Sequence, residues 1–75
     1  MITIYLKNGP IQEHEHWLAK NVGPRLHYLH NSIGGQGWII KKAESTYDGL
    51  HYELKWTLTL EDDRLASWFL IMFPQ

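Results

Sequence analysis

The segment from His51 to Phe73 joins two hydrophobic periodicities with almost no linker between them. Residues 51–60 (HYELKWTLTL) carry large apolar side chains at every second position, which predicts a strand with one buried face. Residues 61–73 (EDDRLASWFLIMF) then repeat apolar residues at helical spacing. A strand that leads directly into a helix must bury both apolar stripes, so the rest of the chain is expected to pack around this unit.

The predicted C-terminal helix begins after Thr59, the expected N-cap, and the acidic residues 61–63 lie where the helix dipole favours negative charge. The helix is expected to reach about Phe73 and to end at Pro74. Five residues form a sufficient core stripe: Leu65, Ala66, Phe69, Leu70 and Phe73. Three apolar residues then remain, at positions where a monomer normally carries charge: Trp68, Ile71 and Met72.

Four further elements are predicted before His51. Their expected bounds are a strand over 1–7, a helix over 11–21 between Pro10 and Gly23-Pro24, a short strand over 25–30 and a strand over 38–44. His14 falls on the apolar stripe of the first helix, so we expect it to be partly buried. Residues 31–37 contain three glycines and are expected to form an irregular turn, and residues 45–49 are expected to close a hairpin.

The element order β-α-β-β-β-α predicts an α+β fold. A mainly antiparallel sheet of three or four strands, with both helices on one face, is the economical way to bury the apolar stripes. With 75 residues, the chain is expected to form a single domain over 1–75.

Composition narrows the expected environment and partners. The chain has no cysteine and no apolar run of about 18 residues, so we expect a cytoplasmic protein without a membrane-spanning segment. A net charge of −1 fits neither a strongly basic nucleic-acid binder nor a strongly acidic mimic of nucleic acid.

The motifs that would support catalysis or metal binding are weak. The glycines at 34, 35 and 37 precede a predicted strand, whereas phosphate loops precede a helix. His14 and His16 point about 200° apart on a helix, and the acidic residues 61–63 fit a helix N-terminus. We therefore expect a non-enzymatic protein with no cofactor and no metal.

A nucleic-acid-binding surface is the alternative interpretation. It would combine basic residues with aromatic stacking platforms, and its candidates are Arg25, Tyr28, Trp38, Lys41 and Lys42. So few cations give only weak attraction to phosphates.

A protein interface is the preferred interpretation. Four Trp and four Tyr exceed what a small core needs, and aromatic side chains are frequent interface anchors. Trp68, Ile71 and Met72 are the main interface candidates, and Tyr5, Tyr47 and Trp38 are secondary ones. For the first three, the alternative is burial in the core, with the last helix between the sheet and the first helix or covered by the end of the chain. A homodimer is also expected.

Several positions resemble a known class of proteins. They are the N-terminal strand, Trp17-Leu18 followed by Asn21-Val22-Gly23, the strand entry Gly37-Trp38, and an acidic last helix with Ala66, Phe69, Leu70 and Phe73. This layout resembles small accessory proteins encoded by bacteriophages. The resemblance implies a viral protein in the host cytoplasm that binds and blocks or redirects a host protein, such as a defence nuclease or a transcription or replication factor.

Overall fold

The chain has an α+β fold, as the sequence predicts. The computed structural model describes residues 1–7, 9–47 and 51–75, and the side chains of these residues outside 43–54. Its elements in chain order are β1 (Ile2–Leu6), α1 (Gln12–Asn21), β2 (Arg25–Leu29), β3 (Ser32–Gly35), β4 (Trp38–Tyr47), β5 (His51–Leu60) and α2 (Asp63–Met72). The helix expected over 11–21 and the strand expected over 51–60 thus lie where the sequence indicates.

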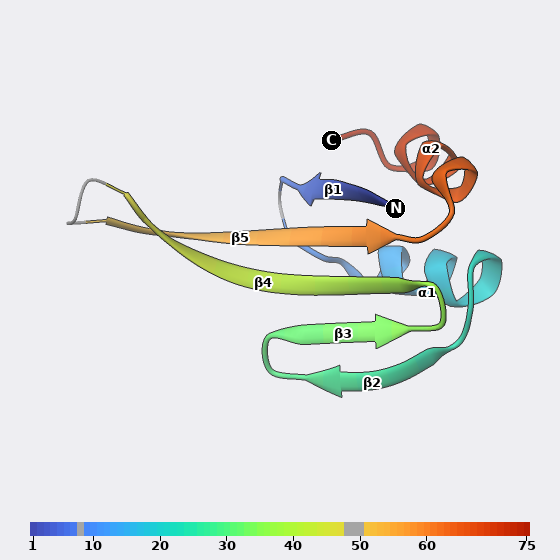
Figure 1. Cartoon of the computed structure of the whole chain (residues 1–75), viewed down its shortest axis with the longest axis horizontal. Coiled ribbons are helices and arrows are strands. Elements are labelled where there is room, and N and C mark those ends of the chain that lie inside the picture. The colour runs from blue at the N-terminus through green and yellow to red at the C-terminus, as the bar shows by residue number, and fades with distance from the viewer. Residues whose placement is uncertain (8, 48–50) are drawn as a thin grey trace.

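The strands form one antiparallel sheet in the order β1-β5-β4-β3-β2 (Figure 1). Within the described residues the sheet has five strands, so the expected count of three or four is wrong. The order is β-α-β-β-β-β-α because the segment predicted as an irregular turn contains β3.

The glycines of that segment have structural roles in a strand and a tight turn. A side chain at Gly34 would overlap the ring of His27, and one at Gly35 would overlap the indole of Trp38. These two glycines therefore leave room for bulky neighbours on opposite faces of β3. Gly37 closes the short β3–β4 turn with φ of +84°, a conformation that glycine adopts without steric cost.

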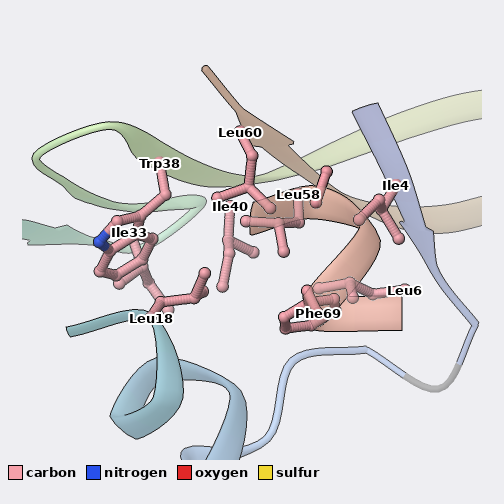
Figure 2. Packing of buried hydrophobic residues seen from close by; sticks show 10 residues of the cluster. Ile4, Leu6, Leu18, Ile33, Trp38, Ile40, Leu58, Leu60 and Phe69 are labelled. Carbon is pink, nitrogen blue, oxygen red and sulfur yellow. The ribbon is translucent and has the colours of Figure 1, made fainter. Parts of the chain in front are cut away.

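One face of the sheet carries the hydrophobic core. The register aligns Ile4 with Leu58, and Leu58 with Ile40 on the next strand, so their side chains share a face. Ten buried residues form the cluster: Ile4, Leu6, Leu18, Ile33, Trp38, Ile40, Leu58, Leu60, Ala66 and Phe69. Because α1 and α2 both contribute, both helices cover this face, as predicted. Figure 2 shows Leu18 beside Ile33 and Trp38, and Phe69 beside Leu6.

Aromatic rings join the two helices. His14 on α1 packs against Phe69 and Phe73, with ring centroids 5.3 and 4.7 Å away, and the two phenyl rings also contact each other at 5.1 Å. Trp17 also contacts Phe69 edge-on, at 5.7 Å. His14 was expected to be partly buried, and it is almost fully buried, with 5% of its surface exposed. These contacts fix the rotation of α2 about its axis.

The β4–β5 hairpin extends beyond the other strands (Figure 1). β3 pairs with β4 only as far as Lys41, and β1 pairs with β5 only from Trp56 onward. Beyond these residues the two strands pair with each other, as far as Tyr47 opposite His51. The expected strand over 38–44 is therefore three residues longer.

Candidate protein-interaction surface

The local sequence sets where α2 starts. Asp62 is the N-cap, and its side chain accepts a hydrogen bond of 2.8 Å from the backbone N–H of Arg64. The prediction of Thr59 as N-cap is wrong, because β5 continues to Leu60. The Thr59 hydroxyl instead lies 3.1 Å from that of Thr3 on the neighbouring strand, and the two form a hydrogen bond. The helix therefore begins three residues later than its expected cap implies.

The outward face of α2 carries large apolar side chains beside the exposed Arg64 and Ser67. Ala66 and Phe69 point into the core, and Trp68, Ile71 and Met72 are 59%, 72% and 58% exposed. These three residues are called the α2 outer surface below. Each falls 60° or more, at 100° per residue, from the direction of Phe69. Exposed apolar side chains clustered on one helix are unusual for a small domain, where single ones are common.

The sequence assigned Leu70 to the core stripe, but the structure leaves it exposed. Phe69 and Phe73 both meet His14, which turns the helix so that the adjacent Leu70 lies at the margin of the buried face. The last turn of α2 carries no basic residue. The apolar area exposed at this end of the helix is thus larger than predicted.

A hollow adjoins the α2 outer surface near the start of the helix. Its lining includes Arg64, Leu65 and Trp68. Leu65 is half-buried, and the Arg64 side chain is exposed. An indole beside an apolar hollow, with a cation at its rim, has the features of an interface anchor.

A second group of exposed apolar residues lies on β2, which the sequence analysis did not assign to an interface. The group consists of Leu26, Tyr28 and Leu29. β2 is the edge strand next to β3, and Leu26 is an extra residue at the irregularity between Arg25 and His27. The signal available in the sequence was the run RLHYLH, which has apolar residues but lacks regular alternation.

Two of the secondary interface candidates, Tyr5 and Trp38, lie apart from each other in the structure. Tyr5 is about half exposed on the sheet face opposite the helices, and the Lys55 ammonium lies 5.4 Å from its ring centroid. Trp38 is only 3% exposed and donates a hydrogen bond of 2.8 Å from its indole N–H to the Gly23 carbonyl. Its place in the core removes Trp38 from the candidate surface. The side chain of Tyr47 lies outside the described residues.

The residues of the alternative nucleic-acid surface do not form one patch. Arg25 lies 5.4 Å from the ring of Tyr28 and forms an ion pair of 3.5 Å with Glu15. Lys41 and Lys42 are adjacent on β4 and so point to opposite faces of the sheet. Lys42 lies over the ring of Trp56. With Trp38 buried as well, the arrangement offers no continuous basic and aromatic surface.

The ionisable side chains that are described are dispersed. No group of three His, Cys, Asp or Glu residues within the described part of the chain could hold a metal ion. Burial lowers the pKa of His14 below its ordinary value, and the nearby Glu13 carboxylate opposes this shift more weakly. His27 is exposed and lies 3.1 Å from the Ser32 hydroxyl.

Comparison of the chain with protein-family models, with curated proteins and with solved structures gave no match. Among the described residues, no helix has the length and apolar character needed to cross a membrane.

Proposed function

We propose that this chain is a small protein-binding module that docks another protein through the α2 outer surface. The observation that carries the proposal is the exposure of Trp68, Ile71 and Met72 together on one helix. Burying such side chains against a partner contributes roughly 25 cal/mol for each Å² of apolar area removed from water, from which the cost of association is subtracted.

The chemistry of the surface supports a protein partner over a nucleic acid. A phosphate backbone requires clustered cations, and the last turn of α2 has no basic residue. Trp and Met are both enriched at protein interfaces, where they fill pockets of the partner. An apolar groove on the partner that receives one face of α2 fits this pattern.

The resemblance to phage accessory proteins extends the proposal. The partner would be a host protein, and occupation of one of its grooves would block or redirect its activity. Contact with a partner requires only the α2 outer surface, so this role needs no catalytic group on the chain.

The test is affinity purification from host lysate with the tagged chain and with the double variant Trp68→Ala, Met72→Glu. We expect the wild type to retain a specific protein that the double variant loses. Truncation of an interface anchor such as Trp68 weakens binding by about 2 kcal/mol or more. The purified partner should then bind in solution with the same dependence on these residues.

A matched control replaces exposed polar residues on the other helix, with Glu13→Ala and Lys20→Ala. This variant should keep the partner. Light scattering on each purified protein measures the mass in solution. If the folded wild type and the folded double variant recover the partner equally, the proposal is contradicted. If only the double variant loses dimerisation, the surface binds a second copy of the chain.

A further inference from the structure

A cleft lies between the start of α1 and the residues that follow α2. The side chains that matter to its chemistry are Lys7, Ile11, His14, Met72, Phe73 and Gln75. Ile11, Met72 and Phe73 provide apolar walls. Among the described residues that line the cleft, Met72 is the one that also belongs to the α2 outer surface. The cleft does not depend on that surface binding a protein.

His14 presents a hydrogen-bond donor to this cleft. Its Nδ1 accepts a hydrogen bond of 3.2 Å from the backbone N–H of Ile11, so the neutral ring carries its proton on Nε2. Nε2 has no hydrogen-bond partner among the described residues. Every fully buried side-chain nitrogen or oxygen of the described residues has a hydrogen-bond partner. Because Nε2 has none, it is not fully buried and must touch solvent. His14 lines the cleft, so the cleft is the space from which a ligand reaches its ring.

Lys7 is the cationic residue among the described residues that line the cleft, and its ammonium has no acidic partner among them. The Glu13 carboxylate acts on His14 from outside this lining. None of the described residues that line the cleft is Asp or Glu. The backbone N–H of Lys7 donates to the Gln75 side-chain oxygen at 3.0 Å, which holds the two sides of the cleft together. An anionic acceptor is the group that an N–H donor in contact with solvent and a nearby ammonium favour.

We propose that the cleft binds a carboxylate carried on a short aliphatic group. One carboxylate oxygen accepts the Nε2–H of His14, the charge is balanced by Lys7, and the aliphatic part packs between Ile11 and Met72. The same chemistry is offered by a free aliphatic acid and by the terminal carboxylate of a peptide chain.

The test is an NMR titration of the full chain with hexanoate and with N-acetyl-leucine, each compared with its neutral amide. We expect at least one of the two carboxylates to shift the resonances of Ile11, His14 and Met72. The Nε2 resonance of His14 should be among those that shift. The amides should cause smaller shifts. The tighter of the two carboxylates identifies a free acid or a chain end as the source.

Two pairs of variants make the assignment specific. Lys7→Gln should weaken carboxylate binding by about threefold, the scale of an exposed charge pair, and Lys20→Gln elsewhere on the surface should not. At the buried position 14, His14→Gln keeps a side-chain N–H donor and should still bind the carboxylate. His14→Glu introduces a side chain of the same size as Gln but without an N–H donor, so its affinity for the carboxylate should fall about tenfold.

Equal shifts from acid and amide would overturn the proposal, as would equal affinities of the Lys7→Gln and Lys20→Gln variants. Both lysines are exposed, so neither result depends on a variant that fails to fold.

Discussion

His14 shows how a single residue can belong to both a helix start and a core. Its Nδ1 accepts the N–H of Ile11, one of the donors that a helix N-terminus leaves without an intrahelical partner. Its ring also packs against both Phe69 and Phe73. Both roles require the neutral imidazole, because protonation removes the acceptor at Nδ1 and places a charge among apolar rings.

We expect stability to fall with acidification through the titration of His14. Its pKa is lowered in the folded chain, so the unfolded chain binds more protons once the pH drops below the ordinary value of about 6.5. The contribution of the neutral His14 ring to the free energy of unfolding is therefore complete above that pH and is lost as the pH falls below it. Urea unfolding midpoints measured between pH 8 and pH 5 test this.

His14→Gln is the control, because a glutamine at this helix position can accept the same backbone N–H and does not titrate. The variant should be less stable at pH 8, where it lacks the ring packing, but its stability should change less with pH. A parallel decline in wild type and variant would show that other groups carry the pH dependence.

At the scale of elements, the sequence predicted best where one periodicity is strong. β5 alternates without interruption and was placed at its observed bounds, and the apolar stripe of α1 was placed within one residue. β3 was not predicted because Gly34 and Gly35 were interpreted as part of an irregular turn. The space they leave is filled by His27 and Trp38, which come from other strands, and such contacts have no local signature.

The N-cap of α2 was misplaced for a similar reason. Thr59 and Asp62 are both good cap residues, and the choice depends on how far β5 continues beside β1. We expect Asp62→Ala to lower the free energy of unfolding by about 1 kcal/mol. Urea denaturation gives this difference.

Glu61→Ala is the matched control for Asp62→Ala, since Glu61 is exposed and adjacent but does not cap the helix. It should change stability by no more than about 0.5 kcal/mol. Equal losses in the two variants would indicate a general effect of negative charge near the helix dipole.

At the scale of the whole molecule, the sequence indicated the candidate surface but not its extent. The spacing on α2 left Trp68, Ile71 and Met72 outside the core stripe, and the structure leaves them exposed. The rotation that also exposes Leu70 depends on His14 of the other helix, and the burial of Trp38 depends on the space at Gly35. Both follow from packing between distant segments, which periodicity does not encode.

The most direct measurement of the central claim is photo-cross-linking from the α2 outer surface. A photoreactive amino acid at Ile71 and, in a separate protein, at Lys20 on α1 samples two exposed positions on different helices. The account predicts a specific cross-link to another protein from position 71 and little from position 20. No cross-link from position 71, or equal yields of the same product from both positions, would contradict it.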